Sequence, residues 1–132
     1  MTASGDIVRG IYEAIAAGDV PAVLAPFDDN IHWVEAENSF CAGGNPHVGP
    51  DNVVSGVFAP HLEGVEGFAA TPHNFVDGED AVAVEGRYTG TVKATGKPLD
   101  AQFAHFWKLK DGKVVGFQQY TDTKQWADVL PG

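Results

Sequence analysis

The chain contains 132 residues, of which 44% are hydrophobic and 11% aromatic, and its formal net charge at pH 7 is −10. This composition excludes a disordered chain, and the length fits a single domain spanning residues 1–132. Nucleic acids and anionic membrane surfaces select clustered basic residues, so 8 lysines and arginines against 18 acidic residues argue against both as partners.

Membrane and export signals are missing from the sequence. No apolar run approaches the roughly 20 residues of a spanning helix, and the first residues have neither the basic nor the apolar region of a signal peptide. The one cysteine, Cys41, cannot form an internal disulfide. A reducing cytoplasm is therefore the expected location.

Two helices are predicted at the N-terminus. Ser4 is placed to cap the first helix, and Gly18 is placed to end it. Asp19 can cap a second, short helix that extends to Phe27. The apolar residues that recur at helical spacing in the first helix are Ile7, Val8, Ile11, Tyr12 and Ile15.

A strand is predicted over residues 31–37, and its period of two places Trp33 and Glu35 on the same face. The stretch that follows is rich in Gly, Pro and Asn and is predicted to be a loop. Pro50 then opens a third helix, which Pro60 should end or kink.

Beyond residue 67 the pattern changes to long strands and one short helix. Three helices followed by antiparallel strands predict an α+β fold. A twisted sheet of this length should curl around the helices and leave a cone-shaped cavity between them. The predicted strands cover residues 68–76, 81–93, 99–110 and 114–122, and the helix covers residues 124–130.

The Asp111-Gly112 turn sets the pairing of the last two strands, because Asp-Gly between alternating apolar residues is a strong hairpin signal. A two-residue loop pairs Lys110 with Lys113, and the same register places His105 opposite Gln118. One face of this hairpin is then aromatic and ionisable, as ligand pockets often are. Its residues are Phe103, His105, Trp107, Gln118, Tyr120 and Asp122.

A second hairpin joins the same face. If residues 94–97 form a four-residue loop, Tyr88 pairs with Phe103 and Gly86 pairs with His105. We expect the cavity to be lined by Gln118 and by a set of aromatic residues. The aromatic candidates are Trp33, Phe40, Phe58, Tyr88, Phe103, Trp107 and Tyr120.

Several motifs along the chain match one known superfamily. They are Gly18-Asp19, Phe27-Asp28-Asp29 before Ile31-His32-Trp33, His47-Val48-Gly49-Pro50, Thr95-Gly96-Lys97 before Phe103-Ala104-His105, Asp111-Gly112-Lys113-Val114, and Gln119-Tyr120-Thr121-Asp122-Thr123. With these motifs the chain resembles the SnoaL-like polyketide cyclase and ketosteroid isomerase branch of the nuclear transport factor two-like superfamily. The resemblance implies a cone-shaped barrel of a curved, mixed, mostly antiparallel sheet covered by three N-terminal helices. It leaves the reaction open, because the superfamily includes isomerases, cyclases, hydrolases and proteins without chemistry.

The resemblance also implies catalytic positions. Glu35 falls where ketosteroid isomerases keep their carboxylate base, and His105 falls where those enzymes place an oxyanion donor. Asp122 matches the acid/base of the cyclases on the terminal strand. The oxyanion tyrosine of the isomerases would align with Ile11, and Tyr12 is one residue away, about 100° around the helix.

Each candidate also has a structural interpretation. A carboxylate in an apolar pocket gains a raised pKa, so Glu35 beside Trp33 suits a base, but it could equally be a solvated strand residue. His105 could donate to an oxyanion or be a core residue bonded to Gln118. Asp122 could act in catalysis or cap the C-terminal helix.

No metal or cofactor is expected. His47, His61 and His73 fall in separate loops or helix ends, without ligand-like spacing. Cys41 lies in no sequence motif of a nucleophilic thiol.

Two functions fit these residues. The first is a cofactor-independent enzyme, isomerase-like or cyclase-like, that moves a proton on a small, largely apolar, oxygenated ligand; Tyr120 could then supply an oxyanion donor. The alternative is a non-catalytic binding or accessory protein that uses the same cavity. The resemblance also implies pairing through the outer sheet face, and a homodimer is expected because that face offers an apolar strip. Its residues are Ala104, Phe106, Val115 and Phe117.

Overall fold

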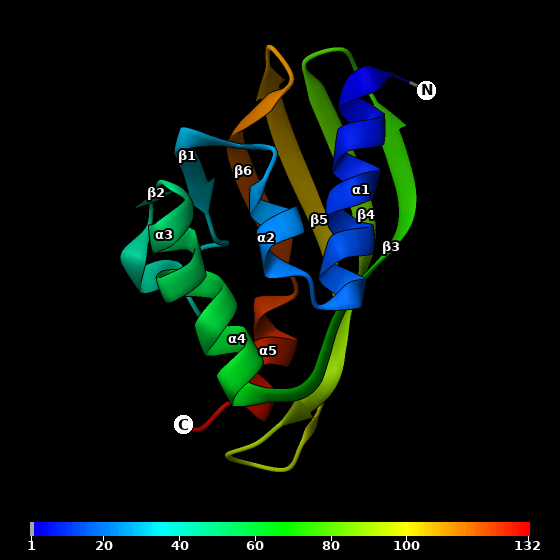
Figure 1. Ribbon diagram of the computed structural model, residues 1–132. Helices are drawn as coiled ribbons and strands as arrows, with labels where there is room; N and C mark the ends of the chain where they lie inside the picture. The colour runs from blue at the N-terminus through cyan, green and yellow to red at the C-terminus, as the bar shows by residue number, and fades with distance from the viewer. Residues whose placement is uncertain (1) are drawn as a thin grey trace.

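A six-stranded mixed sheet organises the protein, and helices cover one of its faces (Figure 1). The computed structural model describes residues 2–132. The strand order is β2-β1-β6-β5-β4-β3, with β1 parallel to β6 and every other pair antiparallel. The sheet is curved but unclosed, because β2 and β3 are free edges. The strands are β1 (Phe27–Val34), β2 (His47–Val48), β3 (Val65–Asp77), β4 (Ala81–Val92), β5 (Pro98–Lys110) and β6 (Lys113–Thr121).

Helices α1 and α2 lie across the concave face, and the helical segment from α3 to α4 lies beside them over the β1 end (Figure 1). This arrangement is the predicted α+β fold. No helix within residues 2–132 is long and apolar enough to cross a membrane. The helices are α1 (Ala3–Ala17), α2 (Val20–Leu24), α3 (Pro50–Val53), α4 (Ala59–Gly64) and α5 (Thr123–Val129).

The cap of the N-terminal helix lies two residues before the predicted cap. The Thr2 side chain caps α1 by accepting a hydrogen bond from the Gly5 amide. The Ser4 hydroxyl is instead buried and donates to the carbonyl of Glu79, in the turn between β3 and β4. Gly18 ends the helix in the left-handed conformation (φ 70°), as predicted.

The second helix is capped by Asp19, as predicted, but it ends at Leu24 because the chain then enters β1. Phe27 belongs to β1, where it is buried and pairs with Val114 of β6. This parallel pairing starts the strand four residues earlier than the sequence pattern indicated.

The third helix continues past Pro60, where the sequence predicted an end or a kink. A π-helical segment, Val54–Phe58, separates α3 from α4, and Pro60 then lies in the first turn of α4. Proline lacks an amide hydrogen, and it is tolerated in a first turn. Residues 50–64 therefore form one continuous helical segment, in which the spacing of the backbone hydrogen bonds changes over Val54–Phe58.

The β4–β5 hairpin is displaced by two residues from the predicted register. The loop begins one residue earlier than expected, because the Val92 amide donates to the Lys97 carbonyl. Tyr88 therefore pairs with Ala101, and Gly86 pairs with Phe103. A shift of two preserves the face on which each side chain lies.

The β5–β6 hairpin contains a bulge that the predicted register missed. Lys110 pairs with Lys113 as predicted, but Val115 is then left without a partner and Lys108 pairs with Gly116. One extra residue reverses the face of every residue beyond it. His105 therefore pairs with Gln119, so the predicted pairing with Gln118 was wrong.

The bulge exchanges the inner and outer residues of β6. Phe117 and Gln119 are buried on the inner face, whereas Gln118 lies on the outer face and Tyr120 is 59% exposed there. The expected apolar strip on the outer face thus loses Phe117. It retains Phe106, which is 40% exposed.

Candidate functional site

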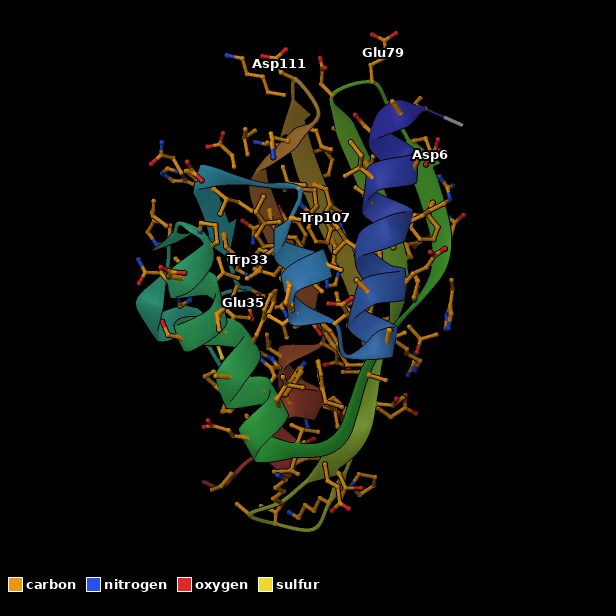
Figure 2. The ribbon with its side chains drawn as sticks, in the orientation of Figure 1. Asp6, Trp33, Glu35, Glu79, Trp107 and Asp111 are labelled. Carbon is orange, nitrogen blue, oxygen red and sulfur yellow. The ribbon has the colours of Figure 1, made fainter. Side chains whose placement is uncertain are left out.

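A cavity of about 140 Å³ lies between the inner sheet face and helices α1, α2 and α4. Figure 2 shows Trp33, Glu35 and Trp107 in the region between the helices and the sheet, whereas Glu79 and Asp111 lie at turns at one end. Most of the lining is apolar. The buried polar side chains that line it are Tyr12, Glu35, His61, Tyr88, His105 and Gln119.

Glu35 is a buried carboxyl group on this cavity. It follows the last residue of β1, and Asn45 holds its backbone: the Glu35 amide donates to Asn45 Oδ1 (2.9 Å) and Asn45 Nδ2 donates to the Glu35 carbonyl (2.8 Å). Only 2% of Glu35 is exposed, and its Oε2 accepts a hydrogen bond from Trp33 Nε1 at 3.1 Å. Burial raises the pKa of Glu35 to about 7, although the Trp33 hydrogen bond opposes this. The carboxyl group can therefore gain or lose a proton near neutral pH.

His105 lies between two tyrosines. Its Nδ1 is 2.5 Å from the Tyr12 hydroxyl oxygen, and its Nε2 is 2.5 Å from the Tyr88 hydroxyl oxygen. Phe103 stacks on the imidazole with ring centroids 3.9 Å apart. Burial lowers the pKa of His105 to about 3, so the imidazole is neutral at physiological pH.

Each tyrosine has a second partner that fixes its hydroxyl group. Trp107 Nε1 donates to the Tyr12 oxygen at 3.0 Å, and Gln119 Nε2 donates to the Tyr88 oxygen at 2.8 Å. Burial raises the pKa of both tyrosines above the usual value of 10.0, so both hydroxyl groups keep their protons. His105 thus contacts two tyrosines rather than Gln118, the residue named in its structural interpretation, and each tyrosine oxygen accepts a hydrogen bond from a further side chain.

Tyr12 lines the cavity, although the resemblance to isomerases placed their oxyanion tyrosine at Ile11. It is 3% exposed and lies on the same buried face of α1 as Val8 and Ile11. Its place in the apolar helical repeat was the sequence signal, since that repeat faces the sheet. The tyrosine reaches the cavity from one position after Ile11.

The aromatic candidates divide into cavity residues and others. Phe103 lies behind His105, and Phe40 is 37% exposed, with its ring packed against His61 and Trp126. Tyr120 points away from the cavity because of the bulge in β6, so it cannot donate to a ligand there. The candidates that line the cavity are Trp33, Phe58, Tyr88 and Trp107.

Asp122 and Gln118 also lie outside the cavity, which corrects the expectation for both. Asp122 is exposed and caps α5, where its Oδ1 accepts a hydrogen bond from the Gln125 amide at 3.1 Å. It follows the end of β6, beyond the reach of the inner face. Gln118 is on the outer face, and its Nε2 donates to the carbonyl of Gln119.

One group of potential metal ligands was not anticipated, because it combines distant segments. Candidate ligand atoms of Glu35, Cys41 and His61 lie within 4.8 Å of one another. Each is already engaged: Glu35 accepts from Trp33, and His61 Nδ1 is 2.7 Å from the Val57 carbonyl and 3.7 Å from Cys41 Sγ. Burial raises the pKa of Cys41 to about 12, which keeps the thiol protonated. We assign no metal to this group, since the protein satisfies it without one.

Comparisons with known proteins agree on one family and fold. A family model described as a SnoaL-like domain matches residues 8–117. No functionally curated protein gives a significant match. An NTF2-like protein from Burkholderia thailandensis E264 is 32% identical, with a TM-score of 0.91 over 96% of both chains.

Two further solved structures share the fold at lower identity. A protein with a ketosteroid isomerase-like fold from Catenulispora acidiphila, in complex with trimethylamine, has a TM-score of 0.78 at 20% identity, covering 95% of this chain and 93% of the other. A candidate SnoaL-like polyketide cyclase from Jannaschia sp. CCS1 has a TM-score of 0.81 at 16% identity, covering 96% and 92%.

Proposed function

Because this chain belongs to the family of SnoaL-like domains, we propose that it is a cofactor-independent enzyme that transfers a proton on a small, largely apolar, oxygenated molecule. One observation carries the proposal: a carboxyl group with a pKa of about 7 and a neutral tyrosine–histidine–tyrosine array line the same cavity. Proton abstraction requires an ionised base, and a pKa near the working pH lets the same group take up the proton and then release it.

The proposed reaction begins at a carbon next to a carbonyl group. Ionised Glu35 takes the α-proton, the C–H electron pair forms a C=C bond, and the carbonyl oxygen becomes an enolate oxygen. A hydroxyl group of Tyr12 or Tyr88 donates a hydrogen bond to that oxygen, which stabilises the developing charge. In an isomerisation, protonated Glu35 then returns the proton to another carbon of the conjugated enolate. In a cyclisation, the enolate carbon attacks a second carbonyl carbon of the same molecule, the π electron pair of that C=O bond moves to its oxygen, and the oxygen takes the proton from Glu35.

The cavity size limits the ligand. A dry cavity of about 150 Å³ in another protein accommodates benzene. The cavity here is of similar volume, about 140 Å³. A ligand with about one six-membered ring is therefore the proposed size class.

A non-catalytic binding protein is the second candidate, and the position of one residue favours it. Asp122, which the resemblance to cyclases assigns to acid/base chemistry, caps α5 on the surface. A cavity with one carboxyl group fewer than the cyclase pattern could hold a ligand without turning it over.

Exchange of α-hydrogens with heavy water distinguishes the two candidates. Cyclohexanone and 2-cyclohexen-1-one are small enough to serve as probes, with binding followed by thermal stabilisation and exchange followed by NMR. We expect exchange above the buffer rate and a loss of at least about 100-fold in Glu35→Gln. The matched control is Glu37→Gln, an exposed position two residues away, which should retain the wild-type rate. Binding without exchange would establish the binding protein instead.

The proposal also covers the location and the oligomeric state of the protein. We propose a cytoplasmic homodimer that pairs through the outer sheet face, where Phe106 and Tyr120 are 40% and 59% exposed. Exposed aromatic groups on one face are typical of an interface.

A further inference from the structure

The hydrogen atoms of the Tyr12–His105–Tyr88 array outnumber the contacts that join it. The array has two contacts, Tyr12 to His105 Nδ1 and Tyr88 to His105 Nε2. A neutral imidazole carries one N–H hydrogen, and each tyrosine carries one hydroxyl hydrogen. Three hydrogen atoms therefore serve two hydrogen bonds, and one hydroxyl hydrogen is left over.

The tautomer of His105 decides where that hydrogen lies. The imidazole nitrogen without hydrogen accepts a bond from its tyrosine, and the other nitrogen donates to the second tyrosine. The oxygen of that second tyrosine then accepts from His105 and from its flanking donor, either Trp107 or Gln119. Its own hydrogen has no acceptor among residues 2–132.

Neither flanking residue can take up the extra hydrogen. The Trp107 indole nitrogen only donates. The amide of Gln119 could accept if it were reversed, but its Oε1 already accepts from the Ala36 amide at 3.0 Å. This bond directs the NH₂ group of Gln119 towards Tyr88. Both ends of the array are thus closed by donors.

We propose that His105 is a tautomeric selector that presents a single hydroxyl hydrogen, at Tyr12 or at Tyr88, to one acceptor oxygen of the bound ligand. The ligand class that follows is a ketone or another carbonyl compound with an acceptor oxygen. The oxygen can be met from the α1 side, at Tyr12, or from the β4 side, at Tyr88. This inference deepens the proposed function and rests on it for the identity of the ligand.

The first test needs no ligand and compares Tyr12→Phe with Tyr88→Phe. In each variant one imidazole nitrogen faces a Phe ring, where an N–H group has no acceptor, whereas the hydroxyl hydrogen of the remaining tyrosine can turn into the cavity that this tyrosine lines. The imidazole hydrogen should therefore move to the nitrogen that faces the remaining tyrosine. We expect the Nε2–H tautomer in Tyr12→Phe and the Nδ1–H tautomer in Tyr88→Phe, each favoured about tenfold.

The measurement is ¹⁵N NMR of histidine-labelled protein, with the His105 signals assigned by their loss in His105→Phe. Tyr120→Phe is the matched control, because that tyrosine lies on the outer face, and it should leave the wild-type tautomer ratio unchanged. The same tautomer in both cavity variants, or a doubly protonated ring in the wild type, would overturn the proposal.

A second test uses the wild type, so it does not depend on the folding of any variant. Cyclohexanone should bind and shift the Nδ1 and Nε2 signals of His105 in opposite directions, whereas methylenecyclohexane, of similar shape without the oxygen, should leave their ratio unchanged. Failure of the ketone to bind, or equal effects of the two probes, contradicts the selector. If the tautomers respond as expected but no α-hydrogen exchange occurs, the proposed reaction is refuted and the selector is retained. If exchange occurs without the tautomer response, the selector is refuted and the reaction is retained.

Discussion

Replacement of Glu35 by Gln should abolish a pH-dependent loss of stability in the wild type. The pKa of Glu35 in the folded protein is about 7, against a usual value of 4.5. Between these values the folded state holds a proton that the unfolded state has released, so the free energy of unfolding falls as pH rises. The contribution is fully present below pH 4.5 and is lost as pH rises through 7.

The size of this effect follows from the interval between the two values. About 2.5 pH units correspond to about 3 kcal/mol of unfolding free energy. Glutamine is isosteric and its oxygen can still accept from Trp33 Nε1, so the variant keeps the hydrogen bond that positions the side chain. The variant should therefore gain about 3 kcal/mol relative to the wild type between pH 4.5 and pH 8.

Urea unfolding followed by tryptophan fluorescence, in steps from pH 4.5 to pH 8, measures this difference. Burial lowers the pKa of His61 and His105, which destabilises the fold on acidification, but both proteins share that contribution and it cancels. Glu37→Gln, at an exposed position, should show a flat difference from the wild type. A change of less than about 1 kcal/mol for Glu35→Gln would show that the carboxyl group is hydrated in the folded protein, and the assignment of Glu35 as a base near neutral pH would fail.

Three further outcomes are expected. Asp122→Ala should lower the unfolding free energy by about 1 kcal/mol through loss of the α5 cap and leave α-hydrogen exchange of the ketone probes unchanged, so a large drop in exchange would return Asp122 to the active site. Gly86→Ala should destabilise by about 1–3 kcal/mol in urea unfolding, because its Cβ would collide with the Thr71 carbonyl and lie 2.5 Å from the Phe103 ring; an unchanged midpoint would contradict this packing. Phe106→Glu should convert the proposed homodimer to a monomer in sedimentation velocity, and a wild type that is already monomeric would refute the interface.

The sequence patterns predicted the elements more successfully than the contacts between them. Helical spacing, Gly18 and Asp19 placed the first two helices, and the Asp111-Gly112 turn gave the correct first pair of its hairpin. Alternation along β1 likewise brought Trp33 and Glu35 to one buried face. These features depend on neighbouring residues, so local patterns reveal them.

The wrong or missing predictions concern the register of β6 and the contacts between distant segments, which local patterns do not describe. The bulge at Val115 depends on packing Phe117 inside, and the only local sign was Gly116 within a strand, a common mark of a bulge. The meeting of Cys41 with His61 depends on the course of an irregular loop and a π-helical segment, which no period describes. Contacts of this kind require the whole fold.

The looped-out Val115 means that β6 encodes two alternative pockets in one stretch of sequence. If Val115 instead paired within the ladder and the bulge were absent, Gln118 and Tyr120 would turn inward and Phe117 and Gln119 would turn outward, with no change in the sequence. The position of one unpaired residue thus decides which side chains of β6 a ligand meets.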